Sequence, residues 1–353
     1  MAKVLINGYF LCRRITGIER YAYEITRRLD RIIQKNEAAI IIPADTPNIP
    51  PYKNLEIIRY KKIKPHIYWQ MVHLQWFLLT HKEYTILDFG NTGLPLAPGI
   101  VFLHDIYCEF FKEDFVGFRD KLVRIYNRWQ YRLITKKAKK IITVSYFIRN
   151  QIADVFHIPA ERIAVIYSSW NHFREIKADY SVFDDFPVLS GPFYFSLGSL
   201  SKRKNSTWII KYASAHPEAR FVLSGADIST ARDAGLETPG TLSNVLFLGF
   251  LNDEKVKALM ERCKAFILPS YYEGFGLTPL EALSCGARII ISNAASLPEI
   301  YGKTAHYIDP FNAEVDLDEI VKTPVEAPGG ILKKYSYDTA AAQVRDIIYE
   351  VIR

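Results

Sequence analysis

The chain has 353 residues, of which 49% are hydrophobic and 24% charged, and its formal net charge at pH 7 is +7. This length suits about two domains with buried cores, and the composition excludes a disordered chain. No apolar run approaches the roughly 20 residues needed to cross a bilayer, which argues against a transmembrane helix. The first residues, MAKVLINGYF, reach a polar Asn7 at once and predict a strand, not a cleaved signal.

The positive charge is concentrated in the first half of the chain. Residues 1–172 carry 26 Lys and Arg against 15 Asp and Glu, a net of +11, whereas residues 173–353 carry 19 against 23, a net of −4. Such an asymmetry suggests a phosphate-rich or membrane-surface partner for the first half. The alternative is a solvated basic surface without a partner.

Short apolar runs alternate with longer amphipathic stretches along nearly the whole chain. We expect strands within VLING, AAIIIP, YTILDF, IVFLHD, KIITVS and RIAVIY, and then within FYFSLGS, ARFVLSG, NVLFLGF, AFILPS, ARIIIS and AHYIDP. Strands this rich in Val, Ile, Leu and Phe, separated by helix-length segments, are typical of parallel sheets covered on both faces. The pattern occurs twice and predicts an α/β protein with two doubly wound, Rossmann-like domains.

We expect the first domain over residues 1–172, a linker over residues 173–191 and the second domain over residues 192–335. The linker segment has mixed polarity, a proline and no clear periodicity. Residues 336–353 have apolar side chains at helical spacing and predict a helix that packs back on the first domain. The four cysteines are far apart and lack metal-ligand spacing, which favours reduced thiols in a cytoplasmic protein.

Two residues of the first half follow predicted strands. Gly17 lies in the turn RITGIER, which leads into a helix, and His104 ends the strand VFLH. Open α/β sheets bind ligands at the carboxyl ends of their strands. The alternatives are an ordinary βα turn for Gly17 and a structural role for His104.

Residues 59–79 combine cations with large aromatic side chains. Four basic residues precede four aromatic ones: Arg59, Lys61, Lys62 and Lys64, then Tyr68, Trp69, Trp76 and Phe77. This mixture suits a patch that lies on an anionic membrane, whereas packing of the aromatic rings in the core is the other interpretation.

The second half contains a glycine turn followed by three adjacent cations. The segment GSLSKRKN begins at Gly198, directly after a predicted strand, and precedes the helix STWIIKYASAH. Arg203 can form a fork of hydrogen bonds to phosphate oxygens, and Lys204 adds a point charge. The segment therefore predicts a pyrophosphate site, although an isolated basic cluster is more often simply solvated.

The most informative segment is PSYYEGFGLTPLEALSCG, residues 269–286. It follows a strand and opens a helix for which Thr278 is the expected N-cap and Gly286 the stop. Helix amides and the helix dipole at such a start can hold an anion, while Glu273 and Glu281 can accept bonds from sugar hydroxyls. The alternative for Glu281 is a capping box with Thr278.

At this point a family resemblance becomes specific. EGFGLTPLEALSCG resembles the E-x7-E signature of glycosyltransferase family 4, whose members are retaining enzymes of GT-B fold. Other segments are similar to the family in the same order: TGIERYAYEI, FLHD, KIITVSYFIRNQI, GSLSKRKN, VLFLGFLND and SNAASLPEIYG. The match covers nearly the whole chain and is nearest in character to mannosyl- and rhamnosyltransferases of bacterial polysaccharide and O-antigen assembly. It implies two domains that face each other across a cleft.

The resemblance implies a role for each residue of the signature. Glu273 would hold the donor sugar near its 3-hydroxyl, and Glu281 would bind the ribose hydroxyls. Four residues of the turn would support the sugar and the phosphates: Gly274, Phe275, Gly276 and Leu277.

It also implies roles outside the signature. Arg203 and Lys204 would neutralise the diphosphate, and Leu251 would line the base through its backbone. In the first half, His104 would contact the donor sugar near the reacting centre, and Gly17 would let its loop approach the diphosphate.

Two segments depart from the family pattern. Some members carry an Arg after the glycine of the phosphate loop, where this chain has Ser199, so Arg203 would carry more of that work. The Asn-Gly turn that is usual at the domain hinge is replaced by the run YSSW, residues 167–170.

The expected reaction moves a hexosyl group from a GDP-, UDP- or dTDP-linked sugar to a glycan or a polyprenyl-pyrophosphate-linked acceptor. Cations and helix amides would stabilise the leaving diphosphate, so we expect no metal and no cofactor. The only Asp-x-Asp, at Asp316 and Asp318, precedes a helical segment and is better explained by capping. Glu273→Ala and Lys204→Ala are each expected to abolish transfer with the fold intact.

Two other functions fit parts of the pattern. A nucleotide-sugar epimerase or hydrolase of the same fold would act on the donor alone. A nucleic-acid-binding protein is suggested by the basic charge and the run KKAKK, but no groove-reading motif is present, and we expect no nucleic-acid partner. We expect a cytoplasmic enzyme, with peripheral attachment to the inner membrane as an additional hypothesis.

Overall fold

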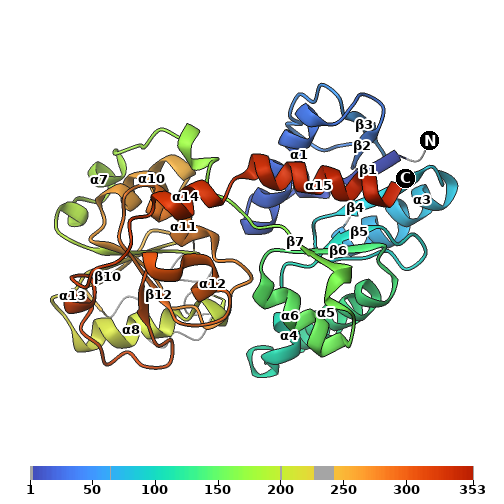
Figure 1. The fold of residues 1–353 in the computed structure, drawn as a ribbon. Coiled ribbons are helices and arrows are strands. Elements are labelled where there is room, and N and C mark those ends of the chain that lie inside the picture. Colours follow the sequence, from blue (N-terminus) through green and yellow to red (C-terminus); the bar gives the residue numbers. More distant parts are fainter. Residues whose placement is uncertain (1–2, 64, 199–200, 226–241, 353) are drawn as a thin grey trace. The chain divides into compact units, whose positions relative to one another are not determined.

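The structure, a computed structural model, describes residues 3–63, 65–198, 201–225 and 242–352. The chain forms two compact units (Figure 1). Unit 1 comprises Met1–Ser168 and Tyr337–Arg353, and unit 2 comprises Ser169–Ser336. The chain therefore passes between the units twice.

Unit 1 is built on a parallel sheet, which has seven strands among the described residues, in the order β3-β2-β1-β4-β5-β6-β7. Their bounds are β1 (Lys3–Asn7), β2 (Ala38–Ile42), β3 (Glu56–Arg59), β4 (Tyr84–Asp88), β5 (Ile100–Phe102), β6 (Lys140–Thr143) and β7 (Ile163–Val165). Six of them are the strands expected from the apolar runs. The prediction missed β3, because this edge strand is short, polar at both ends and mostly exposed.

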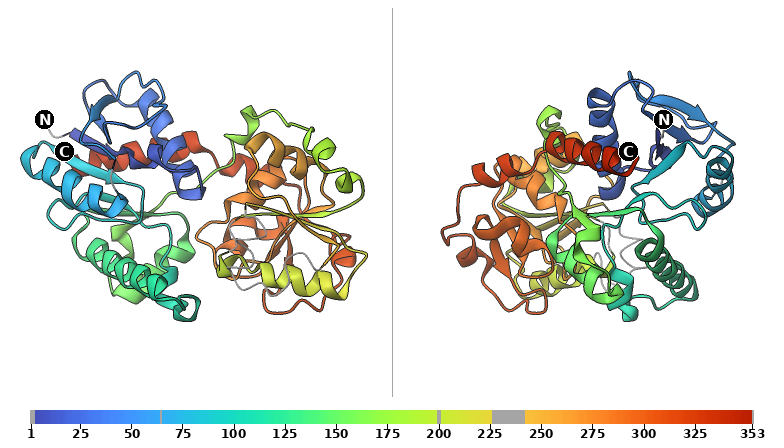
Figure 2. Two further views of the ribbon diagram at one scale, coloured as in Figure 1. Left: turned by 180° about the vertical axis from the view of Figure 1, so that it is seen from behind. Right: turned by 45° about the vertical axis from the view of Figure 1, so that its right-hand side comes forward.

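Helices cover both faces of this sheet. Their bounds are α1 (Gly17–Ile32), α2 (His66–Tyr68), η2 (Trp69–Leu74), α3 (Gln75–Thr80), α4 (Tyr107–Phe110), α5 (Phe118–Lys137), α6 (Tyr146–Phe156) and α15 (Tyr337–Ile352), with short 3-10 turns η1 (Gly8–Cys12), η3 (Lys112–Asp114) and η4 (Ala160–Arg162). Right-handed crossovers from β3 to β4 and from β5 to β6 place α3 and α5 on one face and α1 on the other (Figures 1 and 2). Unit 1 therefore carries α3 and α5 together on one side.

The last helix, α15, packs beside α1 (Figure 1). Arg28 Nε lies 3.0 Å from Asp338 Oδ1, and the rings of Tyr21 and Tyr337 are 6.0 Å apart. Val344 and Ile348, which the helical spacing singles out, are fully buried. Segments from the two ends of the chain thus share one core.

Unit 2 is built on a second parallel sheet, with six strands among the described residues, in the order β10-β9-β8-β11-β12-β13. Their bounds are β8 (Tyr194–Leu197), β9 (Phe221–Ser224), β10 (Val245–Phe247), β11 (Ala265–Leu268), β12 (Ile289–Ser292) and β13 (His306–Ile308). The helical segments are η5 (Phe173–Glu175), α7 (Val182–Asp185), η6 (Pro187–Ser190), η7 (Lys202–Lys204), α8 (Ser206–Ala215), α10 (Asp253–Arg262), α11 (Leu277–Ser284), α12 (Leu297–Tyr301), η8 (Gly302–Thr304), α13 (Leu317–Ile320) and α14 (Gly329–Lys334). All six strands were predicted, and the α/β class with two parallel sheets is confirmed.

Residues 173–191 are not an extended linker between the sheets. They belong to unit 2 and contain η5, α7 and η6. Three apolar side chains of this segment are buried: Phe173, Val182 and Leu189. The mixed polarity of the segment concealed these anchors, because they do not repeat with a helical or strand period.

The strands of unit 2 end in glycine turns at one edge of the sheet. The amide of Gly198, after β8, donates to the Ser224 carbonyl at 3.0 Å, and the amide of Gly225, after β9, donates to the Gly249 carbonyl at 2.7 Å. Parallel strands bring these carboxyl ends together. This edge of the sheet holds the candidate site.

Candidate functional site in unit 2

The site is centred on the turn between β11 and α11. Gly276 is the N-cap of α11 and has a positive φ of 81°. A Cβ atom on Gly276 would lie 2.4 Å from Cδ2 of Leu297, so both the backbone and the packing require glycine. Glycine has no side chain to cap the helix, and within the described part of the chain no capping hydrogen bond is present, so the first amides of α11 can serve a ligand.

The predicted helix start is wrong by two residues. Thr278 is the second residue of α11, not its N-cap, and its Oγ1 is buried without a hydrogen bond to any described residue. Glu281 therefore lies two residues beyond the N3 position that a capping box requires, and that alternative is excluded. Gly286 does end the helix as predicted, with a φ of 82°.

Glu273 is buried in this turn beside two cations. Nζ of Lys204 donates to Oε1 of Glu273 at 2.7 Å, and NH1 of Arg203 lies 3.7 Å from Oε2. Burial alone would raise the pKa of Glu273, but the nearby charges of Lys204 and Arg203 hold it below its ordinary value. Glu273 is therefore a carboxylate at neutral pH, able to accept hydrogen bonds from hydroxyl groups.

The cationic segment η7 is fastened to the turn that carries Glu273. The amide of Tyr271 donates to the Arg203 carbonyl at 3.1 Å. Asn205, in the left-handed region with φ 57°, donates from Nδ2 to the carbonyls of Pro269 and Pro310 at 3.0 and 2.7 Å. Arg203 and Lys204 are thus held against Glu273 by main-chain contacts as well as by charge. Ser199 lies outside the described residues.

Glu281 is buried and contacts a histidine that the sequence analysis did not identify. Nε2 of His172, itself buried, lies 3.0 Å from Oε1 of Glu281. His172 follows the unusual run YSSW and is far from Glu281 in the chain, so no local pattern could reveal the contact. The contact restricts the orientation of the Glu281 side chain.

Two further side chains support the turn from α12. Ser296 Oγ donates to the Glu273 carbonyl at 2.9 Å, and the hydroxyl of Tyr301 donates to the Gly276 carbonyl. The ring of Phe275 packs edge-on against Tyr335 at 5.4 Å. The two hydrogen bonds hold the carbonyls of Glu273 and Gly276 toward α12. In a trans peptide the N–H points opposite to the C=O, so the amides of Gly274 and Leu277 point away from α12.

Leu251 follows β10, directly before Asn252, which caps α10. Gly249, two residues earlier, has φ 65°, and its carbonyl accepts from Ser224 Oγ at 2.9 Å. The main chain at Leu251 therefore lies at the carboxyl edge of the sheet, between Gly249 and the start of α10.

The other two predicted site residues, Gly17 and His104, belong to unit 1. Gly17 is the first residue of α1, after the N-cap Thr16, and a Cβ atom there would meet no described atom within 4 Å. The residue leaves open space at the start of the helix, which is compatible with a ligand but does not require glycine.

His104 lies just beyond β5 and is buried. Its Nε2 is 2.9 Å from the carbonyl oxygen of Phe89, and its amide donates to Asn91 Oδ1 at 2.6 Å. Burial lowers the pKa of His104, although the Phe89 carbonyl and nearby acids act in the opposite direction. Because a carbonyl only accepts, Nε2 carries the proton of the neutral ring and Nδ1 is left as an acceptor.

No group of three or more His, Cys, Asp or Glu side chains among the described residues is placed to hold a metal ion. Asp316 accepts from the amides of Asp318 and Glu319, which confirms the capping interpretation of the Asp-x-Asp segment. Asp318 pairs with Lys264 and accepts from the hydroxyl of Tyr194.

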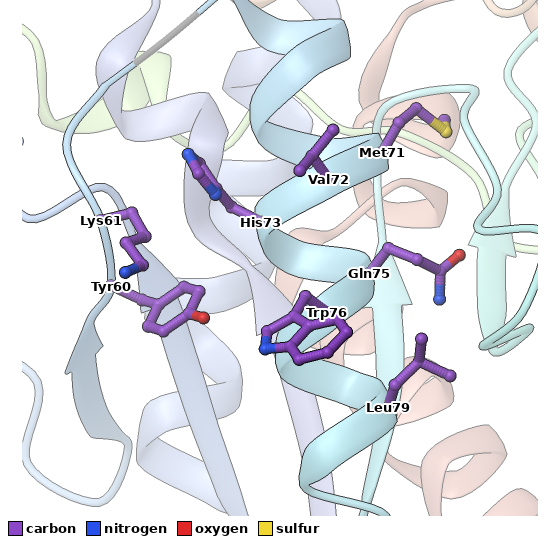
Figure 3. Close-up of a pocket in the computed structure, with 8 residues that line it drawn as sticks. All are labelled: Tyr60, Lys61, Met71, Val72, His73, Gln75, Trp76 and Leu79. Carbon is purple, nitrogen blue, oxygen red and sulfur yellow. The ribbon is translucent and has the colours of Figure 1, made fainter.

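Residues 59–79 of unit 1 are divided between core and surface. Trp69 and Phe77 are buried in the core, which confirms the core-packing interpretation for these two rings, whereas Tyr68 and Trp76 are exposed. A hollow of about 480 Å³ lies beside η2 and α3. Figure 3 shows the residues that line it, with Tyr60 opposite Trp76. Lys64 lies outside the described residues. Nowhere in the described ranges is a helix long and apolar enough to cross a bilayer.

The chain is similar in sequence and in fold to known glycosyltransferases and related enzymes. An O-antigen chain mannosyltransferase B from Escherichia coli is 28% identical over 332 residues, which cover 84% of each chain. Among solved structures, sucrose-phosphate synthase from Thermosynechococcus elongatus has a TM-score of 0.74 at 15% identity, with 99% of each chain covered. Anabaena HepE in complex with UDP and glucose has a TM-score of 0.70 at 18% identity, with 99% of this chain and 100% of that chain covered.

Two family matches divide the chain in the same way as its two sheets. Residues 15–169 match Glycosyltransferase Family 4, and residues 185–322 match Glycosyl transferases group 1. The GT-B fold predicted from the signature is confirmed by the two parallel sheets and by the structural neighbours. The chain belongs to glycosyltransferase family 4.

Proposed function

We propose that the protein transfers a hexosyl group from a nucleoside diphosphate sugar to a glycan or lipid-linked glycan during assembly of a bacterial cell-surface polysaccharide. The similarity to an O-antigen chain mannosyltransferase supports the pathway, and the UDP complex of a structural neighbour supports a nucleotide-linked donor. The nucleotide of the donor is GDP, UDP or dTDP.

The observation that carries this proposal is the pairing of a buried carboxylate with two cations at an uncapped helix start. The cluster of Glu273, Lys204 and Arg203 offers an acceptor for sugar hydroxyls and positive charge for a diphosphate. As the bond between the anomeric carbon and the phosphate oxygen breaks, negative charge grows on the diphosphate. Fixed cations and the amides of α11 stabilise that charge without reorganisation.

The first experiment is a thermal-shift screen of nucleoside diphosphates and their sugars on the whole chain. We expect one base to raise the melting temperature more than the others, and the corresponding sugar nucleotide to support transfer to a lipid-linked acceptor. If no nucleotide stabilises the protein and no transfer occurs, the proposal is wrong.

Retention of anomeric configuration and independence of metal ions belong to the same proposal. NMR of the product would give the configuration at the new bond, and retention requires the same anomer as in the donor. Transfer in the presence of EDTA is expected to equal transfer with added Mg²⁺. An inverted product or loss of activity in EDTA contradicts the corresponding part.

The second candidate function is epimerisation or hydrolysis of the nucleotide sugar. It is favoured by the fact that every contact assigned in unit 2 concerns the donor. Incubation of each donor without an acceptor separates the two, because only an epimerase or hydrolase consumes the donor at its full rate. A nucleic-acid-binding function would require binding to DNA or RNA that weakens steeply with added salt. We expect no such binding.

A further inference from the structure

Helix α5 of unit 1 exposes a stripe of large apolar side chains. Phe118, Leu122, Ile125 and Trp129 are 77%, 50%, 62% and 45% exposed. Their spacing of four, three and four residues places all of them on one side of the helix. Exposed apolar residues are ordinary one at a time, but a continuous helical row of this kind is typical of an interaction surface.

The opposite side of α5 is packed toward the end of the helix, so the stripe is not a core face left uncovered. Tyr131 and Ile134, which lie on that side, are buried. Arg128 pairs with Glu109 at 2.7 Å, and Arg124 Nε donates to the Cys108 carbonyl at 2.9 Å. The orientation of the helix about its own axis is thus determined by contacts on its inner side.

The stripe is accompanied by strong positive charge. Within Phe118–Lys137 there are seven Lys and Arg against one Asp. On a helical projection Arg132 and Lys136 continue the line of the stripe, and Lys121 flanks it. Lysine and arginine stems can lie along an apolar surface while their charged ends reach phosphate groups.

Two more large apolar side chains of unit 1 are exposed. Leu96, in the loop after β4, is 65% exposed, and Trp76 of α3 is 62% exposed. The Leu96 amide donates to Gln75 Oε1 at 3.1 Å, and Lys137 Nζ donates to the Pro95 carbonyl at 3.0 Å. The loop that carries Leu96 therefore contacts both α3 and α5, on the face of the sheet that these two helices cover (Figure 2).

We propose that α5, together with Leu96 and Trp76, is a membrane-docking face on which α5 lies flat in the headgroup region of an anionic bilayer. Apolar side chains between rows of cations match the layered chemistry of acyl chains and phosphates. A second copy of this chain fits less well, because it would bring two strongly cationic helices together. The inference rests on the proposed function for its purpose, which is access to a lipid-linked acceptor.

The test is sedimentation of the whole chain with vesicles, which requires no sugar transfer. One set of vesicles contains phosphatidylglycerol and phosphatidylethanolamine, and the other contains phosphatidylcholine only. We expect at least tenfold stronger partition to the anionic vesicles at low salt, with a blue shift of tryptophan fluorescence. Equal, weak partition to both sets overturns the proposal.

Matched substitutions locate the surface. Ile125→Glu is expected to reduce partition at least tenfold, whereas Phe311→Glu, which alters an 81% exposed side chain of unit 2, is expected to leave it unchanged. Lys136→Glu and the control Lys303→Glu test the charge in the same way. The altered side chains are exposed, so melting temperatures should stay at the parent value.

Two outcomes would contradict the assignment. Equal losses in the unit 1 variants and their unit 2 controls would show binding by net charge alone. Self-association of the parent that Ile125→Glu abolishes, without vesicle binding, would make the face a protein interface. Because the thermal-shift screen of nucleotides needs no vesicles and vesicle sedimentation needs no nucleotide, failure of docking and failure of the proposed function are distinguishable.

Discussion

In the proposed reaction, the ammonium group of Lys204 can bind either the carboxylate of Glu273 or the diphosphate of the donor. Without donor it is bound to the buried carboxylate of Glu273, and a diphosphate would compete for the same ammonium group. Glu273→Gln removes this competition but also removes the charged acceptor for sugar hydroxyls. We expect nucleoside diphosphate binding, measured by calorimetry, to be as tight as in the parent or tighter, with transfer reduced about 10²–10³-fold.

Lys204→Ala is expected to lose both binding and transfer, and it also affects stability. It leaves Glu273 buried beside Arg203 only, which costs on the order of 3 kcal/mol of unfolding free energy. The expectation from the sequence, an unaffected fold, is therefore revised. Lys202→Ala, at an exposed neighbour in η7, is the matched control and should keep most transfer. Normal turnover in Lys204→Ala would show that the cluster is not the donor site.

His172 is a positioning residue, since its only assigned action is on the carboxylate of Glu281. If Glu281 holds the ribose as the family resemblance implies, we expect His172→Ala to raise the donor KM about tenfold with kcat within about threefold, because such a contact would bind the donor equally in the ground and transition states. His172→Gln, which keeps a hydrogen-bond donor, should recover part of the loss. In a double-mutant cycle with Glu281→Gln the effects should not add. Additive effects would contradict the assigned role.

At the scale of elements, the two ends of α11 provide a matched pair of glycines. Gly276 and Gly286 both have positive φ, but only at Gly276 would a Cβ meet another side chain. Gly286→Ala should cost about 1 kcal/mol of unfolding free energy, whereas Gly276→Ala should cost about 2–4 kcal/mol because of the added overlap with Leu297. Urea denaturation measures both. Equal costs would show that Leu297 can move aside.

The carboxyl end of β4 carries a buried acid that makes stability depend on pH. Burial raises the pKa of Asp88 to about 6, against hydrogen bonds from Asn7, Gly90 and Thr92 that favour the charged form. Because the folded pKa lies above the unfolded value of about 3.9, this group contributes stability at low pH that is lost as the pH rises from about 4 through 6.

Asp88→Asn removes this titration. Between pH 4.5 and pH 7.5, the unfolding free energy of Asp88→Asn should therefore rise by about 2 kcal/mol relative to that of the parent. Denaturation of both proteins at the two pH values gives the difference. A constant difference would mean that Asp88 is ionised throughout this range.

At the scale of the whole molecule, the sequence predicted what depends on local pattern. Strands such as AAIII and AFIL are buried on both faces and could be found from composition alone. The polar edge strand β3 could not, because its pairing comes from β2 and not from an apolar run. The Thr-x-x-Glu pattern in α11 was misleading, since the left-handed Gly276 starts the helix earlier.

The candidate site shows the same division. Glu273 was found from the glycine turn before a helix, and Arg203 and Lys204 from the run of cations after a strand; the structure brings them together. His172 and Asn205 act through contacts with residues distant in the chain, for which a single sequence holds no signal. Trp69 and Phe77 are buried, although large aromatic residues next to cations are equally typical of a membrane-binding surface. Only the packing in the folded protein distinguishes a core position from a surface position.

The return of the chain to unit 1 at Tyr337 has a consequence for synthesis. Unit 2 is inserted within unit 1, and the side of α1 that receives Tyr337 and Val344 stays open until α15 has left the ribosome. All strands of unit 2 emerge before that moment. Unit 2 can thus fold while unit 1 is unfinished, and newly made chains carry an uncovered helix that a chaperone can hold until α15 is available.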